Sequence, residues 1–269
     1  MNARAPHRPA SRSPLLLLDI GNTHTHVALS TPARLVRNAD LPTGDLVGGR
    51  AVPFLESLLA GVTPVGTALC SVVPRATRSA VAAVRRRFGH DPLVLTDRTL
   101  AGVGLDYPKP ETIGPDRLAN AIAARHFFGS PSVVVDFGTA VTFDIVDRRG
   151  CYVGGIIAPG LAAMTDYLHE KTALLPRIRI RDVTSPVGRS TEEAMLVGAV
   201  LGYRGLVTRL IGEVRAALGA RRLPVVATGG YDRLIARGVP QISTVRPNLT
   251  LEGLRLFWRE HHGAPSRKP

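Results

Sequence analysis

The pattern of apolar and polar positions divides this chain into two similar halves. The first half opens with four consecutive leucines, residues 15–18, and an apolar run of this length predicts a short strand buried on both faces of a sheet. A turn at residues 19–23 follows, and the next residues alternate up to Ser30 as the returning strand of a hairpin does. The order of strand, Asp-x-Gly turn and strand recurs at residues 132–146. We therefore predict two related lobes.

Helical and extended stretches alternate after each hairpin, which is typical of an α/β fold. In the first lobe, Pro74 and Gly89 suit the first position and the end of a helix. In the second lobe, Ser190 and the two acids after Thr191 are typical of a helix start. The further predicted elements are helices at 52–59, 115–128 and 161–174, strands at 65–72, 93–96, 152–158 and 223–228, a turn region at 40–50 and a long loop at 97–115.

Composition sets the limits of these lobes. Residues 1–14 are basic and rich in Pro and Ser, which predicts a flexible arm. We place the first lobe at residues 15–118, the second at 119–260 and a tail at 261–269. The chain has 269 residues, of which 45% are hydrophobic, so it can bury a core in each lobe. An Arg-rich connector at 176–190 interrupts the second lobe.

The formal net charge of +13 is compatible with a nucleic-acid or membrane role, but its distribution argues against both. Nearly all of the excess is arginine spread through every segment, and no helix-turn-helix, zinc-finger or RNA-binding motif accompanies it. No run reaches about 18 apolar residues, the length of a membrane span. Cys70 and Cys151 lack metal-ligand spacing, and the histidines lack that of a zinc site. We expect no nucleic-acid or membrane partner, and a cytoplasmic protein with reduced, buried thiols.

The first turn brings together groups that can bind a nucleotide phosphate tail. Asp19, Gly21, Asn22 and Thr23 supply a carboxylate, a flexible backbone position, an amide and a hydroxyl within five residues. Glycine permits close approach of a ligand, N–H and hydroxyl groups bind phosphate oxygens, and a carboxylate can hold Mg²⁺ or its waters. An ordinary hairpin turn has the same composition. The second copy at Asp136 favours a pair of phosphate-binding turns.

A second candidate lies where the long loop enters a helix. Gly114, Pro115, Asp116 and Arg117 stand at this point, with proline suited to the first helical position and aspartate to the first turn. On these residues alone, Asp116 either complements the helix dipole or takes part in chemistry. The glycine pair at 229–230, between a strand and a helix, is a weak signal for an adenine or ribose site.

Taken together, these motifs resemble one family, the type III pantothenate kinases, over residues 15–257. The Asp-x-Gly-Thr type of turn is common to the wider superfamily of actin, hexokinase and heat-shock chaperones, and the Gly-x-Asp-Arg element between two such turns narrows the resemblance. The matching motifs are Asp-Ile-Gly-Asn-Thr at 19–23, Tyr107-x-x-Pro110, Gly114-Pro-Asp-Arg117, Asp136-Phe-Gly-Thr-Ala140, Gly154-Gly-Ile-Ile-Ala-Pro-Gly-Leu161, Thr191-Glu-Glu-Ala-Met195, Gly229-Gly230 and Leu249-Thr-Leu-Glu-Gly-Leu254.

The resemblance implies two ribonuclease-H-like lobes of mixed sheet and flanking helices, with a cleft between them, ATP and Mg²⁺ as cofactors, and pantothenate as the phosphoryl acceptor. It also implies a homodimer whose interface helps to build the pantothenate site. The catalytic base implied by the motif match is Asp116. The implied ATP contacts are Asp19 on the Mg²⁺ side, Ile20, Gly21, Asn22, Thr23, His24, Thr25, His26 and Thr139. The implied pantothenate contacts are Tyr107, Gly114, Pro115, Asp116, Arg117 and Thr191, and Asp136 is the implied ligand of a monovalent cation, K⁺ or NH₄⁺.

These implied roles agree with the chemistry of phosphoryl transfer, which needs positioning and charge neutralisation more than covalent help. Arg117 keeps its charge and can form a fork of two hydrogen bonds to the pantothenate carboxylate. Two other readings stay open from the sequence. One is a catalytically idle homologue related to the Bvg accessory factor and linked to transcription. The other is a kinase of the same superfamily with another small-molecule substrate.

Overall fold

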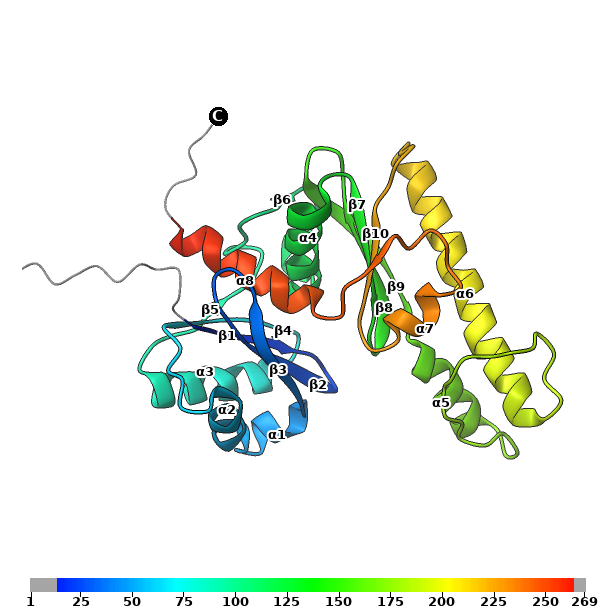
Figure 1. The fold of residues 1–269 in the computed structure, drawn as a ribbon, viewed down its shortest axis with the longest axis horizontal. Coiled ribbons are helices and arrows are strands. Elements are labelled where there is room, and N and C mark those ends of the chain that lie inside the picture. The colour runs from blue at the N-terminus through cyan, green and yellow to red at the C-terminus, as the bar shows by residue number, and fades with distance from the viewer. Residues whose placement is uncertain (1–13, 264–269) are drawn as a thin grey trace, which may run out of the picture. The chain divides into compact units, whose positions relative to one another are not determined.

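The computed structural model describes residues 14–263, which form two units, each with its own β-sheet (Figure 1). Within these residues the first unit comprises 14–101, 114–119 and 250–263, and the second comprises 102–113 and 120–249. Most of the predicted arm and the end of the predicted tail lie outside the described residues. The division made from the sequence assigned consecutive residues to each lobe, whereas in the structure the C-terminal helix returns to the first unit.

The first sheet has five strands in the order β3-β2-β1-β4-β5. The predicted hairpin is confirmed, because β1 pairs antiparallel with β2, and β4 adds to the other side of β1 in parallel. All four leucines of β1 are at most 2% exposed, as expected of a strand buried on both faces. The strands are β1 (Leu15–Ile20), β2 (His24–Ser30), β3 (Leu35–Pro42), β4 (Gly66–Ser71) and β5 (Leu93–Val94).

Helices cover both faces of this sheet. On one face pack α1 (Thr43–Val47), α2 (Ala51–Leu59) and α3 (Pro74–Phe88), whose apolar residues share a core with alternate residues of the strands. On the other face α8 (Leu249–His262) lies so close to β4 that a Cβ at Gly66 would be 2.0 Å from the Trp258 ring (Figure 1). The prediction of a turn region at 40–50 was wrong, since these residues hold the end of β3 and α1.

The second sheet repeats the topology of the first and adds one strand. Its order is β11-β10-β7-β8-β9-β6, so the series β9-β8-β7-β10-β11 matches β3-β2-β1-β4-β5 strand for strand. The pairing agrees as well, because β7 is antiparallel to β8 and parallel to β10. The strands are β6 (Gly104–Leu105), β7 (Ser132–Phe137), β8 (Ala140–Val146), β9 (Cys151–Pro159), β10 (Val225–Thr228) and β11 (Thr244–Val245). The predicted internal repeat is confirmed by this match.

The helices of the second unit follow from local sequence signals. The predicted helix start at Ser190 is confirmed, because the Ser190 hydroxyl accepts a hydrogen bond from the Glu193 N–H at 3.2 Å. The helix that begins there places Tyr203, Val207 and Ile211 in the core of this unit. The helical elements here are η2 (Pro110–Thr112), α4 (Pro115–Phe128), which starts in the first unit, α5 (Leu161–Lys171), α6 (Thr191–Ala217) and α7 (Asp232–Ala236).

Composition led to expectations about membrane spans and about the two cysteines. By length and composition alone, α6 could cross a membrane, and within residues 14–263 no other helix could. Eight of its side chains are nevertheless buried in the structure, as in the core helix of a globular unit. Both cysteines are free, but only Cys70 is buried, so the expectation of two buried thiols was wrong for the partly exposed Cys151.

Candidate active site

The loop between β1 and β2 presents exposed polar groups on a fixed backbone. The Gly21 N–H donates to the His24 carbonyl at 3.0 Å, and a Cβ at Gly21 would stand 3.0 Å from the same oxygen. Asn22, Thr23, His24 and His26 are exposed. The side chains of Ile20 and Thr25 are fully buried, so these two residues offer a ligand only their backbone.

Thr43, at the start of α1, holds this loop in place by hydrogen bonds. Its hydroxyl donates to the Gly21 carbonyl at 2.7 Å and lies 3.0 Å from the Thr25 hydroxyl. Its N–H donates to the Thr23 carbonyl at 3.0 Å. Thr43 is only 3% exposed, so these hydrogen bonds are shielded from water. Sequence reasoning missed it, because a threonine in a presumed turn carries no signal of a distant partner.

Asp19, near the end of β1, lies in an environment that disfavours its charged form. It pairs in register with Cys70 of β4, and the Cys70 thiol donates to Asp19 Oδ1 at 3.3 Å. Burial, together with the negative charge of Asp116, raises the pKa of Asp19 from 3.8 to about 6, although the charge of His26 and the Cys70 thiol lower it in part. Burial likewise raises the pKa of the Cys70 thiol well above its usual value. The Cys70 thiol thus contacts Asp19 at one end of the first sheet, and Asp116 lies near enough to act on Asp19 through its charge.

The Gly-Pro-Asp-Arg element explains how Asp116 is held. Proline occupies the first position of α4, and the Arg117 N–H donates to Asp116 Oδ1 at 2.9 Å. A Cβ at Gly114 would stand 2.5 Å from this oxygen, so glycine leaves room for the carboxylate. Burial raises the pKa of Asp116, while the Arg117 N–H and guanidinium charge oppose that rise. The carboxylate is thus fixed at a helix N-terminus, on a residue that is partly exposed.

The donor set at Asp19 fits a magnesium ion that is bound mainly through phosphate and water. Mg²⁺ in nucleotide sites is held by one or two carboxylates, substrate phosphates and retained waters. A cation beside Asp19 would offset the burial and the negative charge of Asp116 that together raise the pKa of Asp19. Within residues 14–263, no group of three or more His, Cys, Asp or Glu side chains could form an all-protein metal site.

The second unit contains the corresponding turn between β7 and β8. Asp136 is the last residue but one of β7, as Asp19 is of β1, and Thr139 is exposed in the turn. The Gly160 N–H donates to the Thr139 carbonyl at 3.2 Å, and a Cβ at Gly160 would stand 2.3 Å from that oxygen. Gly229 has a φ of 91°, and a Cβ at this position would lie 2.6 Å from Asp136 Oδ1. The glycines of two motifs therefore shape this turn.

Two further predicted substrate contacts lie elsewhere in the second unit. Tyr107 packs against Tyr152 with ring centroids 6.1 Å apart, and a Cβ at Gly154 would stand 3.8 Å from the Tyr107 ring. Thr191, at the start of α6, is exposed and lines an apolar groove beside Pro159. The structure thus brings together Asp19, Asp116 and Arg117 in the first unit, and it places Tyr107, Asp136, Thr139 and Thr191 in the second.

Asn120 and Asp144 are buried polar residues that sequence reasoning missed. The Asn120 amide donates to Asp136 Oδ2 and to Asp144 Oδ2, each at 3.1 Å. A usable signal was present, because Asn120 is the one amide in the otherwise apolar run 118–124. Its partners on β7 and β8 follow only from strand register.

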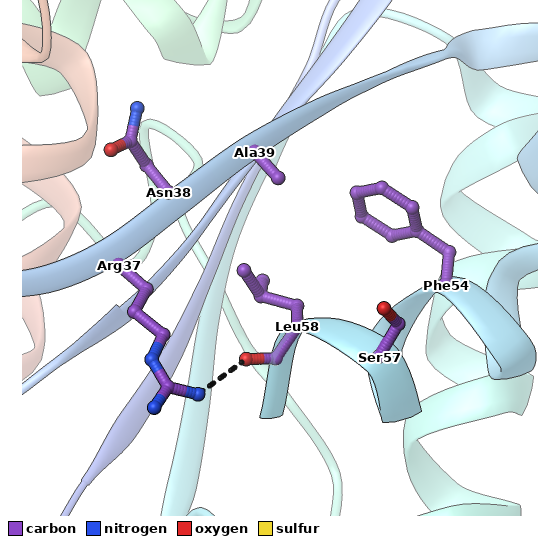
Figure 2. Close-up of a pocket in the computed structure, with 6 residues that line it drawn as sticks. All are labelled: Arg37, Asn38, Ala39, Phe54, Ser57 and Leu58. Atoms are coloured by element: carbon purple, nitrogen blue, oxygen red, sulfur yellow. Dashed lines mark hydrogen bonds between the residues drawn. The ribbon is translucent and has the colours of Figure 1, made fainter. Parts of the chain in front are cut away.

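Of two hollows in the surface of the first unit, one includes a predicted site residue and the other does not. One of about 570 Å³ in the first unit includes Pro115, beside Asp116, and Ser71 and Thr96 at the ends of β4 and β5. Another, of about 470 Å³, lies between β3 and α2 and contains none of the predicted residues (Figure 2). There the Arg37 guanidinium donates to the Leu58 carbonyl at 3.4 Å, and Phe54 forms the opposite wall (Figure 2).

Two units of matching strand order, each with an aspartate before a hairpin turn, define the ribonuclease-H-like architecture of actin-like ATPases and sugar kinases. A family model supports a finer assignment, since the model of type III pantothenate kinases matches residues 15–213. The chain belongs to this family. A type III pantothenate kinase from Akkermansia muciniphila is 48% identical over 243 residues, which cover 90% of this chain and 96% of the relative.

Solved structures agree on the fold. A conserved protein of the Baf transcriptional activator family from Campylobacter jejuni matches with a TM-score of 0.60 at 17% identity, covering 91% of this chain and 98% of the other. Component A of (R)-2-hydroxyglutaryl-CoA dehydratase from Acidaminococcus fermentans matches with a TM-score of 0.53 at 13% identity, covering 93% and 99%. At such identities the likeness concerns the fold alone.

Proposed function

We propose that this protein transfers the γ-phosphoryl group of ATP to the hydroxyl of pantothenate, forming 4'-phosphopantothenate in the first step of coenzyme A synthesis. Membership of the type III pantothenate kinase family supports the reaction. The observation that carries it to this chain is the pair of neighbouring carboxylates, Asp19 and Asp116, at one end of the first sheet. One can serve the metal and phosphates, and the other can serve the acceptor hydroxyl.

Asp116 is the proposed general base. Its Oδ1 is engaged by the Arg117 N–H at 2.9 Å, which orients the carboxylate toward one acceptor position. A carboxylate cannot hold an unactivated alcohol deprotonated, so Asp116 orients the hydroxyl and accepts its proton as the new P–O bond forms. The raised pKa of Asp116 makes its carboxylate a stronger base and so reduces the difference from the pKa of the acceptor hydroxyl.

The two hairpin turns are the proposed phosphate sites. In the first, Gly21 and the exposed Asn22, Thr23, His24 and His26 are directed at the triphosphate, and buried Ile20 and Thr25 contribute backbone groups. Asp19 holds Mg²⁺, which neutralises phosphate charge when bound. In the second turn Thr139 is the proposed ATP contact.

Five further motif residues are the proposed pantothenate contacts. Arg117 pairs with its carboxylate, because a guanidinium matches that group with two hydrogen bonds. Gly114 and Pro115 shape the approach to Asp116, and Gly114 leaves space for the Asp116 carboxylate. Tyr107 and Thr191 complete the proposed contact set.

Asp136 is the proposed ligand of a monovalent cation, K⁺ or NH₄⁺. Its Oδ1 faces Gly229 and Gly138, at 2.6 Å and 3.9 Å from the positions where their Cβ atoms would stand. Such glycines leave backbone carbonyls accessible beside a carboxylate, and large monovalent cations prefer oxygen donors of this kind. The carboxylate of Asp136 and the two glycines beside its Oδ1 fit the ion.

We further propose a homodimer that acts in the cytoplasm. A groove of about 830 Å³ between α5 and α6 is lined almost wholly by apolar side chains. Neighbouring apolar side chains are strongly exposed, with Tyr167 at 62% and Leu174 at 90%. Apolar surfaces of this extent mark protein interfaces. A second copy of the chain covering the groove would bury them beside Thr191, a proposed substrate contact.

The test is a substrate panel with product identification. Purified protein is incubated with Mg²⁺, KCl and ATP, and with pantothenate, glucose or N-acetylmannosamine as acceptor, and products are identified by ³¹P NMR. We expect a phosphomonoester of pantothenate alone. A sugar phosphate would support the reading as another superfamily kinase, and no product from folded protein would support the idle homologue.

A further inference from the structure

One buried amide joins two carboxylates in the second unit. Asn120 on α4 is 1% exposed, and its Nδ2 donates to Asp136 Oδ2 and Asp144 Oδ2, both at 3.1 Å. An amide nitrogen carries two hydrogens, one for each carboxylate. Asp144 is fully buried, and a buried carboxylate is costly unless it accepts such hydrogen bonds.

Strand register explains why the two carboxylates meet at Asn120. Asp144 of β8 stands opposite Val134 of β7, two residues before Asp136. Asp136 and Asp144 are therefore diagonal neighbours on one face of the sheet, within reach of a common partner. Their strand neighbours Val135 and Phe143 point to the opposite face and join the core there.

The two oxygens of Asp136 have different neighbours. Oδ2 is held by Asn120, while Oδ1 lies beside Gly229 and near Gly138 of the β7–β8 turn. Rotation of the carboxylate would break the bond to Asn120 and leave a buried amide hydrogen without its acceptor. The amide thus fixes the direction in which Oδ1 points without adding positive charge.

We infer that Asn120 is a positioning residue for the monovalent cation: its amide, anchored on buried Asp144, holds Asp136 so that Oδ1 faces the ion. The inference rests on the proposed role of Asp136 as cation ligand. A lysine at this place would add a positive charge beside the proposed cation site and weaken cation binding, whereas the amide is neutral. Loss of a group that hydrogen-bonds to a metal ligand typically lowers metal affinity by about 10- to 100-fold.

The test compares Asn120→Ala with Asn120→Ser. Alanine removes both donated hydrogens, and serine retains one, so the KCl concentration for half-maximal activity should rise about tenfold in the alanine variant. The serine variant should show a smaller rise. The KM for pantothenate at saturating KCl should stay unchanged in both, because Asn120 does not contact the acceptor in this account.

A second readout does not depend on kinase activity. The midpoint of thermal unfolding is followed against KCl, with NaCl held to constant ionic strength, with and without a non-hydrolysable ATP analogue. Wild type should be stabilised by K⁺, and the alanine variant should need about ten times more KCl for the same shift. The control is Ser132→Ala on β7, whose buried hydroxyl has no hydrogen-bond partner in the described residues.

The outcomes separate this inference from the proposed function. Wild type that phosphorylates pantothenate without any response to K⁺ in either readout would overturn the inference and leave the kinase intact. An equal KCl requirement in wild type and Asn120→Ala, or the same increase in Ser132→Ala, would also overturn it. A K⁺-dependent thermal shift lost in Asn120→Ala would support it even if pantothenate were not the substrate.

Discussion

The Cys70 thiol donates a hydrogen bond to Asp19 Oδ1 at 3.3 Å across adjacent parallel strands. Both residues are at the end of the first sheet where Asp116 also lies close enough to raise the pKa of Asp19. The fully buried Cys70 cannot touch a ligand itself, so its effect on a ligand must pass through Asp19. This relationship assigns the cysteine a supporting role in a site that is otherwise built of carboxylates.

Replacing Cys70 should therefore change the Mg²⁺ concentration that the reaction requires. Cys70→Ala removes the donor to Asp19 and should raise the Mg²⁺ concentration for half-maximal rate about tenfold. Cys70→Ser keeps a hydroxyl donor in a similar volume and should remain near wild type. The measurement is the initial rate against MgCl₂ at fixed ATP. Equal Mg²⁺ requirements in the alanine and serine variants would contradict this role.

Neutralising Asp19 should stabilise the fold at neutral pH while abolishing activity. The pKa of Asp19 is about 6 in the folded protein and 3.8 in a model peptide, so its stabilising contribution is present below pH 4 and is lost as pH rises through 6. Asp19→Asn avoids this loss, with a gain of up to about 3 kcal/mol above pH 7. The measurement is the thermal midpoint at pH 5 and pH 8.

The matched control is Glu111→Gln, which removes an exposed carboxylate of the same charge. Asp19→Asn should raise the midpoint more at pH 8 than at pH 5, and the control should not. A lower midpoint for Asp19→Asn at pH 8 would show that the buried carboxylate does not carry the expected cost.

Close packing of α8 on the start of α4 predicts a sensitive glycine. A Cβ at Gly253 would stand 2.0 Å from the Ala119 carbonyl, three residues after Asp116. Gly253→Ala should cost about 3 kcal/mol of stability and lower kcat by displacing the start of α4. Gly212→Ala in α6 meets no atom within 4 Å and should instead stabilise by about 1 kcal/mol. Thermal midpoints of both variants test the contrast, and equal effects would refute it.

The apolar groove predicts the site of dimer contact. Tyr167→Glu places a charge on a side chain that is 62% exposed beside the groove, and it should shift the protein from dimer to monomer. Val36→Glu, on a residue of β3 that is 50% exposed, should leave the dimer intact. Light scattering after size-exclusion chromatography measures the mass. A monomeric wild type, or a dimer in both variants, would contradict this placement.

Local signals predicted the elements of the repeat well. The unbroken apolar run of β1, the Pro74 start of α3 and the Ser190 cap of α6 are each specified by neighbouring residues. The sequence did not predict β3, because this edge strand exposes most of its side chains and is extended chiefly through its pairing with β2. Assignment of α8 to the first unit depends on packing against Gly66 and Ala119, which no local pattern encodes.

The residues of the candidate site also fall into those that local sequence specifies and those that depend on tertiary packing. Asp19, Asp116 and Asp136 could be named from the sequence because each stands in a motif with turn or helix-start residues. The sequence contains no signal for the contact of Cys70 with Asp19, which depends on strand pairing. For Asn120 it shows an amide in an apolar run, but not the two carboxylates that the amide contacts. Motifs thus indicate the candidate ligand-binding groups, and the fold supplies the groups that hold them.

The most direct test of the account is the rate of pantothenate phosphorylation by wild type and by Asp116→Asn, in KCl with MgATP. The account predicts rapid product formation by wild type and a loss of at least about 100-fold in kcat for the variant, because the proton acceptor is removed. Pantothenate binding, measured by calorimetry, should be retained. Product formation by Asp116→Asn at the wild-type rate, or no product from folded wild type, would contradict the central claim.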